Sequence, residues 1–187
     1  MKLKLRAVRL SFADLYTAVS KFEGDPKFSA MFIIDKESEE GKANLTEFRK
    51  IVRELEKERL GGKELPIDKL PIQSGDEKDY TGWAGNIILS SSNKKRPIII
   101  GCKKSAAGVW QPITSENDQF APYSGCYVNA IVDAWLMDNQ YGQRIICSLE
   151  AIQFAKDGER FVSSNVNLET DFDELDVEEV SSSVFDL

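Results

Sequence analysis

Basic and aromatic side chains gather in the middle of the chain, in a stretch that has no acidic residue between Asp79 and Glu116. The stretch contains five basic and three aromatic residues, namely Tyr80, Trp83, Lys94, Lys95, Arg96, Lys103, Lys104 and Trp110. Cations neutralise phosphates, and aromatic rings stack on unpaired bases with about 1–3 kcal/mol per base. The stretch therefore favours a binding surface for single-stranded nucleic acid, with ordinary solvated lysines as the alternative.

Two further aromatic residues lie on one face of a long predicted strand, residues 125–138. Apolar residues alternate toward the other face of this strand, so Tyr127 and Trp135 fall on its non-core side. Either these rings stack on bases, or they pack beneath a helix that covers this face. Trp83 and Trp110 fall in loops or at strand ends, which favours their exposure to solvent.

Histidine is absent from the chain, which removes the commonest general base and metal ligand near neutral pH. A Ser-His or Cys-His nucleophile pair is therefore impossible, and an all-cysteine zinc site needs four cysteines where the chain has three. Cys102, Cys126 and Cys147 lie in apolar runs, and we expect buried free thiols. Glycine-rich phosphate loops are also missing from the sequence. These features favour a protein that is not an enzyme and has no catalytic residue, metal or cofactor.

One catalytic alternative uses carboxylates alone, as in a metal-dependent nuclease. Its candidates are Asp133, Asp138 and Glu150, without a supporting lysine motif. A second alternative is an acidic interaction protein, or a DNA mimic that inhibits a nucleic-acid enzyme. A DNA mimic would carry its acidic residues across the folded body. The distribution of charge along the chain therefore tests this second alternative.

The net charge of −7 is concentrated at the C-terminus. Residues 169–187 hold eight acidic and no basic residues, whereas in residues 1–168 the 24 basic residues nearly balance the acidic ones. The first thirteen residues carry four cations and no acid, and acidic residues concentrate between Asp35 and Asp79. A near-neutral body with basic segments on one side is typical of a phosphate-binding face. This distribution counts against the DNA mimic.

The segment 169–187 has the composition of a disordered tail. It is acidic, continues with a serine run, and ends in apolar residues that include Phe185. A tail that only keeps a protein in solution does not need this ending. We expect the tail to compete with DNA for the basic face and to dock partner proteins through Asp176, Glu178, Glu179 and Phe185. The alternative is a flexible terminus with neither role.

Alternation of polar and apolar residues predicts strands at residues 2–12, 27–36, 125–138 and 144–155. The segments NIILSSS and RPIIIGC flank Asn93–Lys95 and predict a basic β-hairpin.

One helix is predicted at residues 45–60. Asn44 and Glu47 form its capping box, and Gly61 and Gly62 end it. Its apolar stripe indicates a helix that covers a sheet.

Five to seven strands of uneven length, with one α-helix inserted between early strands, predict a mainly β protein. An OB-fold-like antiparallel β-barrel fits this pattern, and a β-sandwich is the alternative. We expect one domain at residues 1–168, followed by the acidic disordered tail at 169–187. No run of about 18 apolar residues occurs, and the alternating N-terminus is unlike a signal peptide, so we expect a soluble cytoplasmic protein.

Residues 123–161, YSGCYVNAIVDAWLMDNQYGQRIICSLEAIQFAKDGERF, resemble the single-stranded DNA-binding proteins of tailed bacteriophages. The earlier segments RLSFADLY and FSAMFIIDK and the acidic tail extend the resemblance over most of the chain. The resemblance rests mainly on the order of a strand, an Asn-x-Tyr-Gly turn, a strand ending in Gln-Phe, and Asp-Gly-Glu. Family tails usually end in the aromatic residue itself, whereas here Asp186 and Leu187 follow Phe185.

The resemblance implies an OB-fold protein that coats single-stranded DNA, largely without sequence specificity, during phage replication or recombination. It implies that the tail recruits polymerase or helicase, and that the protein acts in the cytoplasm of the host. It carries over Tyr127, Trp135, Tyr141 and Arg144 as DNA-face positions. The oligomeric state stays open, with a dimer as one option.

Overall fold

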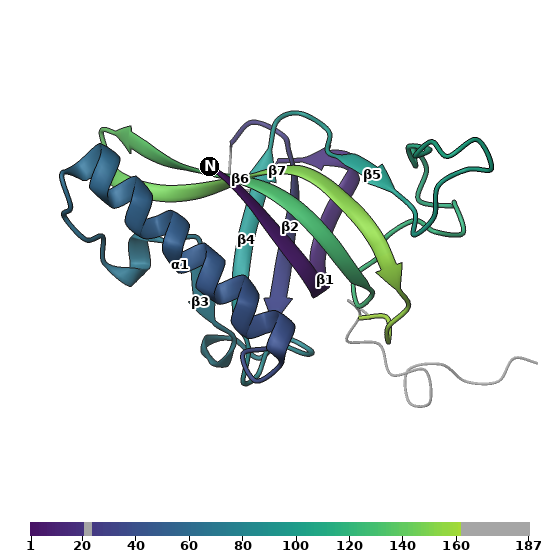
Figure 1. Cartoon of the computed structure of the whole chain (residues 1–187), viewed down its shortest axis with the longest axis horizontal. Helices are drawn as coiled ribbons and strands as arrows, with labels where there is room; N and C mark the ends of the chain where they lie inside the picture. Colours follow the sequence, from purple (N-terminus) through teal and green to yellow (C-terminus); the bar gives the residue numbers. More distant parts are fainter. Residues whose placement is uncertain (21–23, 162–187) are drawn as a thin grey trace, which may run out of the picture.

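The computed structural model describes residues 1–20 and 24–161, and the predicted acidic tail lies outside these residues (Figure 1). The elements in chain order are β1 (Lys2–Val19), β2 (Lys27–Ile34), α1 (Glu39–Leu60), η1 (Ile67–Lys69), β3 (Ile72–Ser74), η2 (Gly75–Glu77), β4 (Ile87–Asn93), β5 (Ile98–Ile100), β6 (Tyr127–Asn139) and β7 (Gly142–Lys156). The strands form one sheet in the order β3-β4-β2-β1-β6-β7-β5. The predicted mainly β class with one inserted helix is confirmed.

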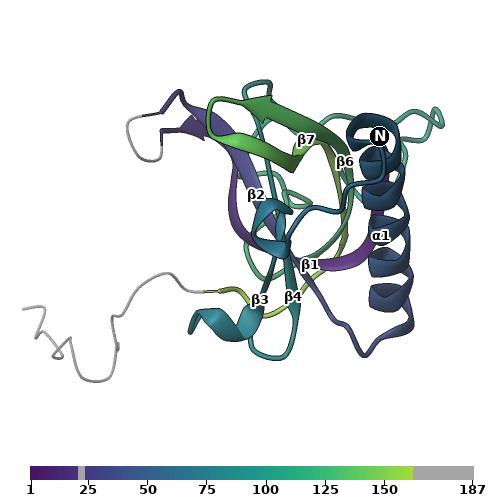
Figure 2. The ribbon, with the colours of Figure 1, turned by 90° about the vertical axis from the view of Figure 1, so that its left-hand side faces the viewer.

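The sheet curls until β4 lies beside β7, which closes a barrel of β1, β2, β4, β6 and β7 (Figures 1 and 2). At this seam the side-chain amide of Asn93 donates to the carbonyl of Leu149 at 3.1 Å. A five-stranded, partly open antiparallel barrel is the OB architecture. The predicted OB-like fold is therefore confirmed, and the sandwich alternative is not.

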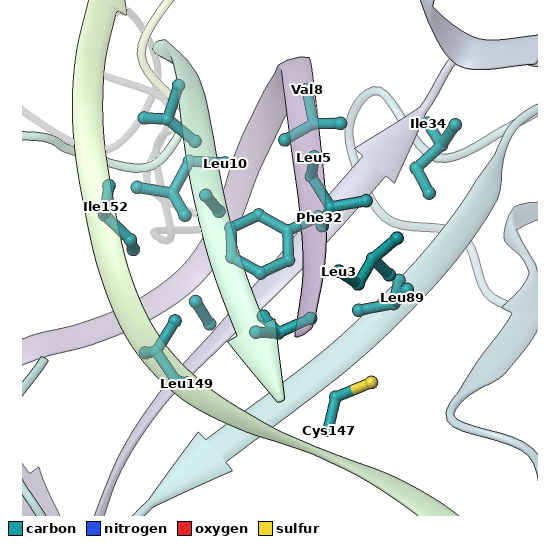
Figure 3. Packing of buried hydrophobic residues seen from close by; sticks show 14 of the residues in the cluster. Leu3, Leu5, Val8, Leu10, Phe32, Ile34, Leu89, Cys147, Leu149 and Ile152 are labelled. Atoms are coloured by element: carbon teal, nitrogen blue, oxygen red, sulfur yellow. The ribbon is translucent and has the colours of Figure 1, made fainter. Parts of the chain in front are cut away.

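The barrel interior is filled by alternate residues of every barrel strand. Figure 3 shows side chains of β1, β2, β4 and β7 pointing toward one another, among them Leu5, Phe32, Leu89 and Leu149. The predicted apolar positions of β6 also face inward, because Val128, Ala130, Val132 and Ala134 are buried. The side chains that alternate with these on each strand point away from the barrel core.

The helix α1 begins earlier than predicted, at Glu39. Ser38 is its N-cap, and the Ser38 hydroxyl accepts from the Gly41 N–H at 3.0 Å. The predicted capping box at Asn44 and Glu47 is wrong, since Asn44 lies within the helix and is buried. The predicted end is confirmed, because Gly61 takes a left-handed conformation with φ of 62°.

Asn44 has a different role, which is to bind the backbone of β1. Its side-chain oxygen accepts from the Arg6 N–H at 3.0 Å, and its amide donates to the Arg6 carbonyl at 2.8 Å. The β1–β6 ladder shifts register between Leu5 and Val8, where Ala7 has φ of 50°. At this bulge the N–H and carbonyl of Arg6 do not pair with β6, and the Asn44 side chain bonds to both groups instead. It also fixes α1 to β1, beside the barrel (Figure 2).

The predicted hairpin around Asn93–Lys95 is wrong. β4 pairs with β2 along its length and with β3 at Ile87–Leu89, and its last residues lie beside β7, where Asn93 donates to the Leu149 carbonyl. β5 instead pairs in parallel with β7. The predicted hairpin of β6 and β7 is confirmed, with its turn between Asn139 and Gly142.

The described residues contain no helix that is both long and apolar enough to cross a bilayer. Cys102, Cys126 and Cys147 are free thiols, as predicted, with Cys102 only partly buried. Burial raises the thiol pKa of Cys126 to about 11 and that of Cys147 to about 12.

Candidate nucleic-acid interface

Aromatic rings gather on the outer side of the barrel, over β1, β2 and β4. Phe12, Tyr80 and Trp83 contact one another edge to face, with ring centroids 4.8 Å apart for Phe12–Tyr80, 5.7 Å for Phe12–Trp83 and 4.8 Å for Tyr80–Trp83. Phe12 and Tyr80 are each 43% exposed. We call the surface formed by Arg9, Phe12, Tyr80, Trp83, Tyr127 and Phe161 the aromatic face.

Trp83 lies at the base of this face and is 0% exposed, so the predicted exposure of its ring is wrong. The ring packs on Ile33 and Ile88, which point away from the barrel core, and its indole N–H donates to the Ser11 hydroxyl at 3.1 Å. The loop that carries Trp83 folds down onto the sheet, held by the bond from the Gly85 N–H to the Asp76 carboxylate at 2.7 Å. Trp83 therefore supports the two exposed rings and cannot stack on a base in this conformation.

Cations lie against the rings at the other side of the aromatic face. The Arg9 guanidinium carbon is 4.3 Å from the Phe161 ring centroid and 5.8 Å from that of Tyr127. The Lys156 ammonium lies 4.6 Å from the Tyr127 centroid. Arg9 is held in place because it donates to the carbonyls of Gly125 and Glu159, each at 2.9 Å. Rings and cations thus meet on one surface, as a ligand with flat bases and charged phosphates requires.

Three serines and a methionine lie on the same outer side of β2 and β4. Ser29 pairs with Ser92 and Met31 with Ser90 across the two strands, and all four are half-buried. β2 and β4 correspond to the second and third strands of the OB barrel, whose outer face is the usual oligonucleotide site. The aromatic face therefore adjoins the surface that this architecture uses for binding.

The basic residues of the loop after β4 are mostly engaged within the protein. Lys94 forms an ion pair with Asp25, and its hydrogen bond and charge lower the pKa of Asp25. Arg96 donates to the Thr114 carbonyl at 2.6 Å. Lys95 is exposed and its ammonium forms no ion pair within residues 1–20 and 24–161, which leaves it the most available cation of the three.

A second group of predicted residues lies on the loop between β5 and β6, which projects away from the barrel (Figure 1). The Lys104 ammonium lies 5.6 Å from the ring centroid of Trp110. Trp110 is 38% exposed, so its predicted exposure is confirmed. Lys103 is also exposed on this loop.

A third group lies on the β6–β7 hairpin. Trp135 is exposed and donates from its indole N–H to the Ser148 hydroxyl at 2.9 Å, so no helix covers it. Tyr141 is exposed in the turn, and Arg144 follows it on β7, opposite Met137. The hairpin turn corresponds to the loop between OB strands four and five, which also contacts ligands in this architecture.

The predicted site residues are thus spread over the aromatic face, the loop after β4, the β5–β6 loop and the β6–β7 hairpin. Of these residues, Tyr80, Trp83 and Tyr127 belong to the aromatic face. Sequence reasoning missed Arg9, Phe12, Lys156 and Phe161 as members or neighbours of this face. The acid-free first thirteen residues were a usable signal for Arg9 and Phe12. The predicted tail residues Asp176, Glu178, Glu179 and Phe185 lie outside the described residues.

The carboxylates of the nuclease alternative do not form a cluster. Asp133 pairs with the N-terminal ammonium at 2.8 Å, Asp138 accepts from Gln143 at 2.9 Å, and Glu150 accepts from Asn93 at 3.2 Å. Across residues 1–20 and 24–161, no three acidic or cysteine side chains are grouped as metal ligands would be.

Known proteins similar to this chain come from bacteriophages. A family model described as Enterobacter phage Enc34, ssDNA-binding protein, matches residues 1–181. "Putative protein p50" of Acyrthosiphon pisum secondary endosymbiont phage 1 is 35% identical over 190 residues, which cover 96% of each chain.

Two solved structures share the fold. The single-stranded DNA-binding protein of bacteriophage Enc34, in complex with ssDNA, superposes with a TM-score of 0.73 and 23% identity, over 86% of this chain and 89% of that one. The single-stranded DNA-binding protein gp2.5 of bacteriophage T7 superposes with a TM-score of 0.56 and 9% identity, over 93% and 96%.

Proposed function

The chain belongs to the family of the Enterobacter phage Enc34 ssDNA-binding protein, and from this premise we propose that it binds single-stranded DNA through the aromatic face. The observation that carries the proposal is the pair of half-exposed rings, Phe12 and Tyr80, on the outer side of the barrel. Arg9 and Lys156 lie at the edge of the same surface. Bases stack on the rings, and the cations attract the phosphates.

Binding of this kind has little sequence preference. Every base has a π-face, so stacking is tolerant of sequence, whereas sequence readout needs polar groups directed at base edges. Unpaired bases are required, because a duplex hides the faces that stack.

The other predicted groups extend the DNA path beyond the aromatic face. These are the cations Lys94, Lys95 and Arg96, the projecting residues Lys103, Lys104 and Trp110, and the hairpin residues Trp135, Tyr141 and Arg144. A strand that crosses the outer side of β2 and β4 reaches the β6–β7 turn at one end, as ligands of OB-folds do. We expect each group to add affinity, most of all for long strands.

We further propose that residues 1–168 bind DNA and that residues 169–187 regulate the binding. The eight acidic residues compete with DNA for the cations, and Phe185 docks a replication or recombination protein. The protein then coats and protects DNA in the host cytoplasm during phage replication or recombination, without catalysing a reaction.

Three phenylalanine and tyrosine variants test the site. Phe12→Ala and Tyr80→Ala each remove a ring that is 43% exposed, and Phe120→Ala is the matched control, since Phe120 is 37% exposed and lies outside the aromatic face. We expect each face variant to lose about 1–3 kcal/mol of binding free energy for a short oligo(dT). The control keeps its affinity. Equal affinities for all three variants would exclude the aromatic face as the site.

A salt series separates the stacking from the charge contacts. Each phosphate contact to a single strand contributes about −0.7 to the slope of log affinity against log salt. Trp110→Ala should lower affinity and leave this slope unchanged, whereas replacing Lys94, Lys95 and Arg96 by alanine should reduce both. A triple variant with the wild-type slope would remove that loop from the proposed DNA path.

A further inference from the structure

The residues that follow β7 lie back across the aromatic face. We call residues 157–161 the strap. The Tyr123 hydroxyl donates to the Asp157 carboxylate at 2.8 Å, and the Phe161 N–H donates to the Ser124 carbonyl at 3.0 Å. Both ends of the strap are therefore hydrogen-bonded to the residues that precede β6.

Two glycines make this close seating possible. A Cβ atom at Gly125, whose φ is 108°, would lie 2.0 Å from the Glu159 carbonyl oxygen, and one at Gly158 would lie 2.2 Å from the Gly125 carbonyl oxygen. Any side chain at either position would lift the strap from the body. The contact is thus part of the fold of residues 1–161.

The strap ends with Phe161 in a narrow slot on the aromatic face. The Arg9 guanidinium lies 4.3 Å from the ring centroid. Next to the ring is Gly82, where a Cβ atom would be 2.8 Å from the Phe161 Cζ. The ring also packs on the cluster of Trp83, Ile33 and Ile88. A nucleobase is also a flat ring, and it could stack in the same place, against the Arg9 guanidinium and next to the backbone of Gly82, which has no side chain.

We propose that this slot is a binding site for an unpaired nucleobase, and that Phe161 occupies it when no DNA is bound. The proposal rests on the proposed function of the aromatic face. Phe161 fills the space beside Gly82, where an added Cβ atom would lie 2.8 Å from the ring, so a base cannot enter between them. A base must therefore displace Phe161, and the strap leaves with it.

Arg9 connects the strap to the phosphates. One of its two hydrogen bonds goes to Gly125 in the body, and the other goes to Glu159 in the strap. When the strap leaves, the first bond still orients the guanidinium, and the second donor is free for a phosphate oxygen. Asp157, Glu159 and Arg160 leave the surface together, which removes a net charge of −1 that repels DNA.

The variant Phe161→Ala, in the full-length chain, distinguishes two roles of the Phe161 ring. A ring that blocks the slot weakens DNA binding, whereas a ring that stacks on DNA strengthens it. Apparent affinity is reduced by the fraction of molecules that are open, so if about nine in ten straps are closed, the variant should bind oligo(dT) about tenfold more tightly. Phe120→Ala is again the matched control and should bind as the wild type does. An unchanged or weaker affinity of Phe161→Ala would overturn the proposal. If the wild type does not bind oligo(dT) at all, the proposed function itself fails, which is a different result.

Limited trypsin digestion tests the displacement in the unmodified protein. Trypsin cleaves after Arg160, whose guanidinium lies 4.1 Å from the Tyr123 ring centroid while the strap is seated. We expect saturating oligo(dT) to accelerate cleavage of the Arg160–Phe161 bond, measured by mass spectrometry of the released C-terminal fragment. Slower or unchanged cleavage at this bond, with DNA bound, would show that the strap stays in place and would refute the inference.

Discussion

The buried pair of Trp83 and Ser11 gives the sharpest prediction about stability. Both side chains are almost inaccessible to solvent, at 0% and 3% exposure, and the indole N–H has the Ser11 hydroxyl as its partner at 3.1 Å. Ser11→Ala leaves the indole N–H buried without an acceptor. Trp83→Phe leaves the hydroxyl without its donor and also loses part of the ring contact with Ile33 and Ile88.

An orphaned buried polar group costs about 1–3 kcal/mol, whereas removing both partners together costs much less. Each single variant should therefore lower the free energy of unfolding by about 1–3 kcal/mol, with Trp83→Phe at the upper end. The double variant should be less destabilised than the sum of the two, with a coupling energy of about 1–2 kcal/mol. For a chain of this size, each kcal/mol corresponds to about 2–4 °C in melting temperature.

Urea unfolding of the wild type, the two single variants and the double variant, followed by circular dichroism, measures all four free energies. Equal slopes against urea concentration are required, so that the midpoints report stability alone. Strict additivity of the two substitutions would show that Trp83 and Ser11 do not interact. A fully stable Trp83→Ala variant would refute the burial of the ring altogether.

Three other predictions concern the helix, the tail and the thiols. Asn44→Ala removes both bonds to the Arg6 backbone and should cost about 2 kcal/mol of unfolding free energy in the same urea assay; an unchanged midpoint would contradict this. Deleting residues 169–187 should strengthen oligo(dT) binding most at about 0.01 M salt, where the screening length is about 30 Å, and less as salt rises; equal affinity at every salt concentration would exclude competition. The folded state holds the thiol protons of Cys126 and Cys147 more tightly than the unfolded chain, so stability should be full below about pH 9 and fall as the pH rises toward 11–12; an unchanged urea midpoint over this range would contradict the burial of the thiols.

Periodicity in the sequence was sufficient for the long elements. The alternation in residues 125–138 predicted which side of β6 faces the core, because a strand with one buried face has a period of two. The predicted hairpin around Asn93–Lys95 could not be judged in this way. β5 pairs with β7 instead, and this pairing of segments that lie far apart in the sequence leaves no signal in the local alternation.

The site was harder to predict than the fold for a similar reason. Trp83 stands among polar and glycine residues, which are typical of an exposed loop, yet the loop folds onto an apolar patch made by Ile33 and Ile88. Phe12 lies in a strand but has φ of 46°, which turns the backbone at the aromatic face. Local composition therefore predicted the kinds of residue that form the aromatic face, and the pairing of the strands decided which of them lie together.

The central claim is that unpaired bases are what this protein binds. It is tested most directly by titrating the full-length protein into a fluorescein-labelled single strand of about 16 nucleotides, the upper end of OB site sizes, and into the duplex of the same sequence. Both anisotropy titrations are run at each of several salt concentrations across about 0.05–0.2 M, because affinity falls with salt at different slopes for single strands and duplex. We predict tighter binding to the single strand at every salt concentration, with the difference persisting at the highest. Equal or tighter binding to the duplex would contradict the claim.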